Sequence, residues 1–565
     1  MRLKCVCQRH GIVVFAAVLL SFCCAGRAEA QGGEPRSFAI RGAKVVPVSG
    51  APLENATVLV SRGVITAVGT NVIVPPDAWV IEGKGLIVYP GLVDAFTDVG
   101  VAAAPATSAG GGSPGGGEGS ARPPISTPIS KGPEDRPATT PWRNAADEIN
   151  LADARIEGWR SAGFTTTVSA PKTGMFPGQA AVLNLGGERA GNLVVKAPVA
   201  VPVSLQAPGG FRSYPGSLMG AIAYVRQVWI DTNWSAQAET IYEKNPRGME
   251  RPRYDQSTEA LKESLQKHAV VLISGNTSLQ IRRALALGEE WKLNYVIYGG
   301  QMGYQVAAEI AAKKVPVLVD LKWPEAAKEG DPEDVPSLRT LRFRDRAPSS
   351  PAALEKAGVK FAFYSGGLTA AKEILPAVKK SIDAGLSADA ALRALTLSPA
   401  EILGVADVLG SIEKGKIANL VVTDGDLFDK KTKVKMVFVD GRKFEVREPL
   451  RPSEPPKGDL SGKWKITTTT PEGQEELTAE LSMEADGTLT GTVNSPTRGT
   501  GNIFSGYVSE EKFSFTINLP IEGNPTDVQI TGTFEGNTMK GSISTLGYTF
   551  DFSGTKPGAA AGGAR

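Results

Sequence analysis

Two aspartates stand close together in a strongly apolar segment, IVYPGLVDAFTDVG. Asp94 and Asp98 both fall inside this segment, so both belong to the end of one predicted strand. Together with water, two such carboxylates could bind magnesium or calcium through oxygen ligands, or contact a substrate. The structural alternative is that Asp94 hydrogen-bonds neighbouring backbone and Asp98 is a solvated loop charge. The residues alone leave both interpretations open.

Ser274 and Ser365 are candidate nucleophiles, which require a base within hydrogen-bond reach. A Ser-His-Asp triad would have to pair Ser274 with His268, but these residues lie at opposite ends of one apolar run, KHAVVLIS. His268 stands where a helix gives way to a strand, a place that favours an imidazolium against the helix dipole. A Ser-Lys arrangement with Lys322 depends on a proximity that the sequence does not reveal.

The first thirty residues have the pattern of a signal peptide. A basic start precedes an apolar run, residues 12–22, which is too short to span a bilayer, and Ala28-Glu29-Ala30 has small residues at the cleavage-type positions. We predict a signal peptide over 1–30, cleavage near Ala30, and export to the periplasm or the cell exterior. A lipoprotein would need a lipidated cysteine behind small residues, whereas Cys23 follows Phe22.

Composition excludes several classes of function for the exported chain. Removal of residues 1–30 shifts the net charge from +2 to about −1, so we expect no attraction to nucleic acid or anionic membrane. No later apolar run reaches transmembrane length, and we predict no membrane span. With no thiol left for a disulfide or a zinc cluster, the chain must be stabilised by packing. All four cysteines lie in the removed segment: Cys5, Cys7, Cys23 and Cys24.

Strand and helix patterns divide the remaining chain into regions. Short strands predicted over 31–86 and again over 405–447 form a composite β unit. Over 87–404, buried strand-length runs alternate with amphipathic helical stretches, which favours a parallel (β/α)-barrel. Residues 99–142 include SAGGGSPGGGEGSARPPISTP, a Gly- and Pro-rich composition that predicts a disordered insertion.

A second domain is predicted after a Pro-rich linker, residues 448–458. Residues 459–556 show only strand patterns with Asp-Gly and Glu-Gly turns, which predicts an antiparallel β-barrel or β-sandwich, and residues 557–565 form a disordered tail. We expect the aromatic residues that recur at strand spacing to lie mainly in the core of this domain. The alternative is that they line a ligand cavity, as in small lipocalin-like barrels. These are Trp464, Tyr507, Phe513, Phe515, Phe534, Tyr548, Phe550 and Phe552.

Several separated motifs together resemble the amidohydrolase superfamily, in particular its exported imidazolonepropionase-like and dihydroorotase-like members. IVYPGLVDAFTDVG resembles the signature in which Pro-Gly and an Asp precede His-x-His, and GWRSAGFTTTVSAP with FPGQAAVLNLGG resembles the segment after strand two. LGSIEKGKIANLVVTDGD with KVKMVFVDGRKF resembles the return into the β unit. The likeness runs from about Phe38 to Val446. It implies an α/β fold: a (β/α)8 TIM-like barrel with a composite β-sandwich unit from both flanks.

The resemblance also implies a mechanism whose residues are missing here. Family members use zinc or another divalent metal to activate water, and an Asp on the last strand takes the proton. Phe96 and Asp98 stand at the His-x-His positions, and Gly366 follows Ser365 where the Asp belongs. Ser274 and Gly299 stand where later strands should deliver histidines. The whole sequence contains two histidines, one of them in the predicted signal peptide, so we predict no metal site and no cofactor.

We therefore expect Phe96, Asp98, Ser274, Gly299 and Gly366 to form a barrel mouth that contacts a small molecule or peptide. The glycine pairs 299–300 and 366–367 either let backbone approach a ligand or fill a collapsed metal pocket. Three hypotheses follow: a ligand- or partner-binding pseudoenzyme; a hydrolase of cyclic amide or related C–N bonds with a non-standard or metal-free site; and a structural envelope protein whose β-domain is the working part. Expression of that β-domain alone would separate the third hypothesis from the others.

Overall fold

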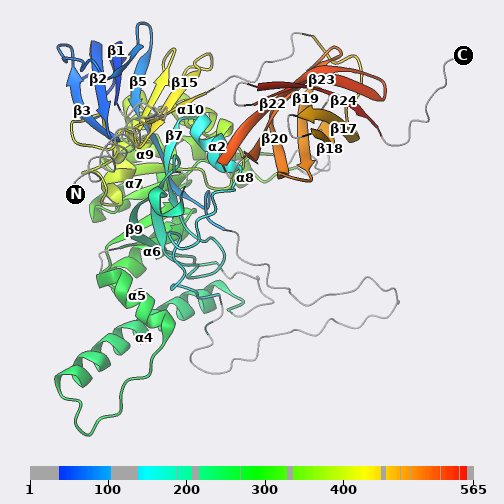
Figure 1. Cartoon of the computed structure of the whole chain (residues 1–565). Helices are drawn as coiled ribbons and strands as arrows, with labels where there is room; N and C mark the ends of the chain where they lie inside the picture. The colour runs from blue at the N-terminus through cyan, green and yellow to red at the C-terminus, as the bar shows by residue number, and fades with distance from the viewer. Residues whose placement is uncertain are drawn as a thin grey trace, which may run out of the picture. The chain divides into compact units, whose positions relative to one another are not determined.

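The structure is a computed structural model that divides the chain into two compact units, Met1–Val446 and Arg447–Arg565. Each unit is described by itself below (Figure 1). The described residues are 37–102, 136, 138–187, 189–206, 215–266, 269–326, 335–446, 454–470, 473–484, 486–521, 524–545 and 548–556. The predicted signal peptide, tail and His268, and most of the predicted insertion and linker, lie outside the described residues.

The first unit contains a composite sheet built from both of its flanks. The sheet order is β16-β15-β14-β5-β1-β2-β3, with β4 paired to β1. The flanks meet where β14 pairs antiparallel with β5, Leu420 opposite Pro90. The strands are β1 (Ser37–Val45), β2 (Leu53–Ser61), β3 (Val64–Gly69), β4 (Trp79–Glu82), β5 (Ile87–Pro90), β14 (Leu420–Thr423), β15 (Val434–Val439) and β16 (Arg442–Glu445).

A second eight-stranded sheet of this unit forms the barrel, in the order β13-β12-β11-β10-β9-β8-β7-β6. Its ends meet where the backbone N–H of Ser365, directly after β13, donates to Oδ1 of Asp94 on β6 at 2.9 Å. The strands are β6 (Leu92–Thr97), β7 (Phe164–Ser169), β8 (Ala180–Asn184), β9 (Val194–Val203), β10 (Val270–Gly275), β11 (Tyr295–Gly299), β12 (Val317–Asp320) and β13 (Phe361–Tyr364).

One strand departs from the all-parallel barrel that the sequence predicts. β8 pairs antiparallel with both β7 and β9, whereas the other neighbouring strands are parallel. Parallel neighbours need a crossover of a dozen or more residues, usually with a helix. The segment between β7 and β8, residues 170–179, contains no helix, and α3 (Ala190–Leu193) is the only helix between β8 and β9. The barrel sheet is therefore mixed.

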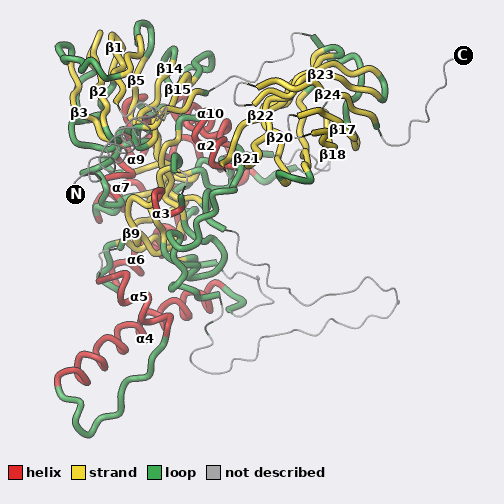
Figure 2. The backbone as a smooth tube through the Cα atoms, viewed as in Figure 1, coloured by secondary structure: helices red, strands yellow, loops and turns green. Residues whose placement is uncertain are grey.

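Helices cover the barrel because its strands carry apolar side chains on both faces. Val271, Ile273 and Val317 belong to a core shared with the helices, while Leu272, Val296 and Leu318 pack inside the barrel. Figure 2 shows these helices in red around the strands. They are α2 (Arg155–Ser161), α4 (Leu218–Lys244), α5 (Gln256–Gln266), α6 (Ser278–Glu290), α7 (Ala307–Lys313), α8 (Leu338–Arg346), α9 (Ser350–Lys356), α10 (Ile374–Asp383), α11 (Ala388–Ala394) and α12 (Leu397–Ile402).

The predicted disordered stretch, 99–142, is packed at both of its ends. Val99 is fully buried, and Val101 forms an isolated β-bridge with Ile149. At the other end, the hydroxyl of Thr139 lies 2.7 Å from that of Tyr224 and is buried. Apolar and β-branched residues at these two ends pack against the barrel. The average composition of residues 99–142 does not reveal this packing, because glycine and proline dominate it. Within the described residues, no helix is long and apolar enough to cross a membrane.

The second unit is a closed antiparallel barrel, which decides between the predicted barrel and sandwich. Each strand pairs with its sequence neighbour, and β24 closes on β17. The interior is filled: Trp464, Phe513, Phe515, Phe534 and Phe552 are buried, as predicted, whereas Tyr507 and Phe550 are half-buried. The strands are β17 (Gly462–Thr470), β18 (Gly473–Met483), β19 (Thr488–Ser495), β20 (Gly499–Ser509), β21 (Lys512–Ile521), β22 (Asn524–Glu535), β23 (Thr538–Thr545) and β24 (Tyr548–Thr555).

Candidate functional site

Four strand ends contribute the side chains at the mouth of the first unit's barrel. Residues two apart on a strand share a face, so the strand-end residues continue the inward rows of Leu272, Val296, Leu318 and Ala362. Register supports this, because Ser274 is opposite Tyr298 and Asp320 is opposite Tyr364. Gly299 lines the cavity together with Tyr298, a residue that was not among the sequence candidates. The inward alternation of Val296 and Tyr298 is the signal that would have found it.

Phe96 fills the centre of this mouth together with two tyrosines. Its ring centroid lies 5.1 Å from that of Tyr298 and 5.8 Å from that of Tyr364, and the two tyrosine rings are 6.4 Å apart. These distances are typical of packed aromatic pairs. Burial raises the pKa of Tyr298 to about 12 and raises the pKa of Tyr364 well above its usual value, so both hydroxyls stay protonated at neutral pH. The first His-x-His position is thus occupied by an apolar cluster.

Asp94 is buried and joins the two ends of the barrel sheet. Its Oδ1 accepts the Ser365 backbone N–H, and its Oδ2 accepts the indole N–H of Trp159 at 3.0 Å. Burial raises the pKa of the Asp94 carboxyl, and these two donors oppose the rise. The signature's Gly91 permits the close strand packing, since a Cβ there would lie 2.0 Å from Oγ1 of Thr165. Of the two sequence interpretations, these contacts correspond to the structural one for Asp94.

Asp98 is half-buried and paired with two cations, so it is not the solvated charge considered above. Its Oδ1 lies 2.9 Å from Nη1 of Arg155 and 3.3 Å from Nζ of Lys172. Although partial burial opposes ionisation, the nearby Lys172 and Arg155 lower the pKa of the Asp98 carboxyl. Lys172 also donates to the Gly366 carbonyl at 3.3 Å, which links this ion-pair cluster to the end of β13.

Asp320 occupies the space that a side chain at position 366 would need. Gly366 has φ +62°, and a Cβ built on it would lie 1.9 Å from Oδ1 of Asp320. The Asp320 carboxylate accepts the Lys322 backbone N–H at 2.8 Å and the Tyr364 hydroxyl at 3.3 Å. Burial raises the pKa of Asp320 to about 6, against the opposing influence of these donors and of Lys172. A neighbouring strand therefore supplies a carboxylate where the resemblance implies the proton-accepting Asp.

Neither candidate serine is paired with a histidine or a lysine among the described residues, although Ser365 lies against the Asp94 carboxylate. Ser365 is buried, with its hydroxyl 3.4 Å from that of Thr97, and the Ser274 hydroxyl accepts the Leu205 backbone N–H at 2.9 Å. Within the part of the chain that the structure describes, neither serine hydrogen-bonds a lysine. Lys322 contributes its backbone, not its ammonium, to the Asp320 contacts.

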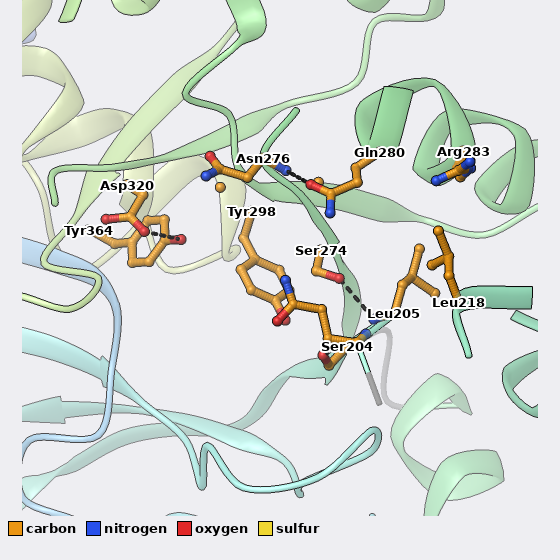
Figure 3. Close-up of a pocket in the computed structure, with 13 residues that line it drawn as sticks. Ser204, Leu205, Leu218, Ser274, Asn276, Gln280, Arg283, Tyr298, Asp320 and Tyr364 are labelled. Carbon is orange, nitrogen blue, oxygen red and sulfur yellow. Dashed lines mark hydrogen bonds between the residues drawn. The ribbon is translucent and has the colours of Figure 1, made fainter. Parts of the chain in front are cut away.

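A cavity of about 230 Å³ opens at this mouth (Figure 3). Asp320 and Tyr364 lie at one end and Arg283 with Leu218 at the other, with Tyr298 and Ser274 between them. A capping box between Thr277 and Gln280 begins α6 at the cavity wall. The lining residues are Ser204, Leu205, Gln206, Leu218, Ser274, Gly275, Asn276, Gln280, Arg283, Tyr298, Gly299, Asp320 and Tyr364.

These residues do not fit the metal that the resemblance implies. Zinc in hydrolases needs about three nitrogen, sulfur or carboxylate ligands converging on one point. Among the described residues, no group of three or more His, Cys, Asp or Glu side chains could hold a metal ion. The Phe96 ring cannot donate an electron pair, and the Asp94 and Asp98 carboxylates already bind N–H groups and cations.

The fold agrees with that of a solved amidohydrolase. An amidohydrolase from Thermotoga maritima MSB8 is 25% identical with a TM-score of 0.60, and the match covers 72% of this chain and 100% of that one. Residues 328–446 match the family model named Amidohydrolase family. The fold of the first unit and the sequence of its C-terminal part are thus similar to those of amidohydrolases. A comparison with curated proteins finds no match.

Two more distant solved structures of the amidohydrolase fold contain small molecules. A prolidase complexed with N-methylphosphonate-L-proline is 17% identical over 73% of this chain and 100% of its own, with a TM-score of 0.45. A Xaa-Pro dipeptidase with methionine bound in the active site is 15% identical over 72% of this chain and 100% of its own, with a TM-score of 0.43. The C-terminal barrel lies outside the family-model match, which ends at residue 446.

Proposed function

We propose that this protein is an exported amidohydrolase-superfamily pseudoenzyme whose barrel mouth binds a small molecule without metal-dependent hydrolysis. The observation that carries the proposal is the packing of Phe96 against Tyr298 and Tyr364 in the centre of the mouth. A hydrolytic metal would need an electron-pair donor at that place. The proposal includes cleavage near Ala30 and a periplasmic or extracellular location, both of which rest on the N-terminal sequence pattern.

The remaining acidic groups support this proposal. The Asp94 carboxylate holds the two ends of the barrel together, and the Asp98 carboxylate is neutralised by Arg155 and Lys172. A carboxylate committed to two cations attracts a third only weakly, because they repel it. The cavity beside these groups still has polar walls, so the mouth retains a binding site.

A second candidate function is a metal-free hydrolase of cyclic amide or related C–N bonds. The observation that favours it is the position of Asp320, whose carboxylate lies where the family's proton acceptor would stand. A carboxyl with a pKa of about 6 suits general-base catalysis near neutral pH, because it is ionised there and still takes up a proton readily. In this alternative, Asp320 would accept the proton of a water molecule attacking a bound amide.

Metal content and turnover separate the two candidates. The purified mature protein is incubated with zinc or manganese, dialysed and submitted to elemental analysis, while hydrolysis of dipeptides and cyclic amides is measured with and without added metal. For the pseudoenzyme we expect neither stoichiometric metal nor turnover. Turnover without metal that Asp320→Asn abolishes would establish the second candidate.

Bound metal with activity that Asp98→Ala abolishes would overturn both candidates and establish a rebuilt metal site. Asp147→Ala is the matched control, because Asp147 is an exposed acid outside the ion-pair cluster. Its metal content and activity should equal those of the wild type under either candidate.

A further inference from the structure

We propose that the cavity binds a small zwitterion of the amino-acid class, with the ligand's carboxylate at Arg283 and Gln280 and its ammonium at Asp320. This inference rests on the proposed function and names the ligand class of the same site. The lining contains one basic and one acidic side chain, and Figure 3 places them at opposite ends of the cavity. A ligand with both charges can therefore neutralise both ends at once.

Arg283 is the first observation behind this assignment. Its half-buried guanidinium has no ion pair or hydrogen bond to any described residue, whereas the adjacent Arg282 makes a two-pronged ion pair with Glu309. A guanidinium presents a planar fork of donors that matches a carboxylate. An unpaired cation facing a cavity is thus ready to bind an anionic group.

Gln280 is the second observation at this end. Residues three apart on a helix are neighbours, so Gln280 and Arg283 lie on the same face of α6. The Gln280 amide oxygen accepts the backbone N–H groups of Asn276 at 3.1 Å and Thr277 at 3.0 Å. Those two bonds fix the orientation of the amide, and its NH2 group makes no hydrogen bond with a described residue. It is available as a second donor to the carboxylate.

The opposite end lacks a direct cationic partner. Asp320 accepts hydrogen bonds from Tyr364 and from the Lys322 backbone, but forms no ion pair with a described residue. The charged and titratable groups around it are Lys172, Lys322 and Tyr364. A ligand ammonium would provide the missing charge partner, because a buried carboxylate is stabilised by an adjacent cation.

The dimensions and remaining walls of the cavity restrict the ligand's size. About 230 Å³ is below the range of roughly 300–1,000 Å³ that accommodates drug-sized ligands. Leu205 and the Tyr298 ring contribute apolar surface between the charged ends, and Leu218 does so at the Arg283 end. This combination fits an amino acid with a small aliphatic side chain better than a longer peptide.

Calorimetric titration of the full mature chain tests the inference. The probes are glycine, L-alanine, L-valine and L-proline, followed by the amide and the N-acetyl form of the tightest-binding one. We expect saturable binding of at least one amino acid, and a loss of about tenfold or more when either charge is removed. If the amide or the N-acetyl form bound as tightly as the amino acid, or if none of the four amino acids bound saturably, the inference would be overturned.

Two variants with a matched control test the charged ends separately. Arg283→Gln should weaken amino-acid binding about tenfold while leaving the weak binding of the amide unchanged. Arg282→Gln, on the same helix but outside the cavity lining, should bind as the wild type does. Binding should also weaken as the pH falls through about 6, where Asp320 becomes protonated, and Asp320→Asn should remove that pH dependence.

The turnover assay keeps this inference distinguishable from the proposed function. If dipeptides or cyclic amides are hydrolysed while amino acids still require Arg283, the pseudoenzyme proposal fails and the zwitterion site stands. If no turnover occurs and the charge-deleted ligands bind as tightly as the amino acid, the zwitterion site fails and the pseudoenzyme proposal stands.

Discussion

The two units of this chain each close an eight-stranded sheet around a core, but they differ in the side chains that lie inside the barrel at the strand ends. The C-terminal barrel is antiparallel throughout, and buried Trp464, Phe513 and Phe515 fill it. In the amidohydrolase-type barrel, the aliphatic interior gives way at the strand ends to Ser274, Asp320 and two tyrosines beside a cavity. The same number of strands thus encloses an aromatic core in one unit and leaves a cavity at the strand ends in the other.

The difference follows from how the strands are connected. Parallel strands all end on the same edge of a sheet, so side chains distant in sequence converge there together with the first turns of the following helices. β10, β11, β12 and β13 run parallel and supply that edge, and α6 follows β10. In an antiparallel barrel, neighbouring strands end on opposite edges, so no single edge collects all the strand ends.

The largest expected effect concerns the filled core of the C-terminal barrel. Phe515→Ala removes a fully buried ring and should lower the free energy of unfolding of that unit by about 3–5 kcal/mol. Differential scanning calorimetry of the whole chain should show that unit's transition moving and the other staying. Lys463→Ala, at an exposed position of β17, is the control and should change stability by less than about 0.5 kcal/mol. An equal effect of both variants would contradict a packed interior.

At the barrel mouth, Gly366→Ala should destabilise the first unit by about 2–4 kcal/mol, because a left-handed backbone and a collision with Asp320 both oppose it. The neighbouring Gly367→Ala is the control, since its Cβ would meet nothing closer than Lys322 Cγ at 3.6 Å. In an Asp320→Ala background the cost at position 366 should shrink. Urea unfolding of the wild type, the two single variants Gly366→Ala and Asp320→Ala, and the double variant measures this coupling. Additive losses of stability in the double variant would refute the collision.

Asp320→Asn should stabilise the first unit at neutral pH, by up to about 3 kcal/mol for a pKa raised from 3.8 to about 6. Because the folded state holds the proton more tightly, the wild type loses stability as the pH rises from about 4 to about 6. The gain from asparagine should therefore be present at pH 7 and absent near pH 4. Melting temperatures across this range test it, with exposed Asp407→Asn as the control. A gain independent of pH would contradict the assigned pKa.

Asp98→Asn should have the smallest effect and the opposite sign. Its carboxylate is stabilised by Arg155 and Lys172, so its folded-state pKa is lowered and its contribution is present above about pH 4 and lost as the pH falls through the folded value. Since the side chain is 39% exposed, solvent screening limits the loss to about 1 kcal/mol or less at pH 7. A stabilising effect at pH 7 would show that the ion pairs do not compensate for burial.

Local patterns predicted the elements of this chain, but not how the mouth is assembled. Apolar runs such as AVVLIS predict β10, and the signature segment predicts β6, because burial on both faces is recorded in the residues themselves. The antiparallel direction of β8 depends on the connecting segment, 170–179, whose apolar and turn residues do not specify direction. Tyr298 enters the mouth because it lies opposite Ser274, a pairing that the sequence does not specify.

The two charged ends of the cavity could not be predicted from the sequence, for a different reason. Asp320 and Gly366 lie on neighbouring strands and interact through space, and no local pattern links them. Arg283 looks like its neighbour Arg282 in the sequence, and only the structure distinguishes the unpaired guanidinium from the one held by Glu309. The sequence shows that position 366 is not an Asp, but it does not show that Asp320 on the neighbouring strand places a carboxylate there.

The contact between Gly366 and Asp320 limits which substitutions position 366 can accept. While Asp320 occupies its present place, a Cβ at position 366 would lie 1.9 Å from a carboxyl oxygen, far inside van der Waals contact. An aspartate at position 366 is therefore opposed until Asp320 itself has changed, and loss of Asp320 alone leaves the mouth with no carboxylate at this point. While Gly366 and Asp320 are both present, a carboxylate at position 366 therefore requires a second substitution, at position 320.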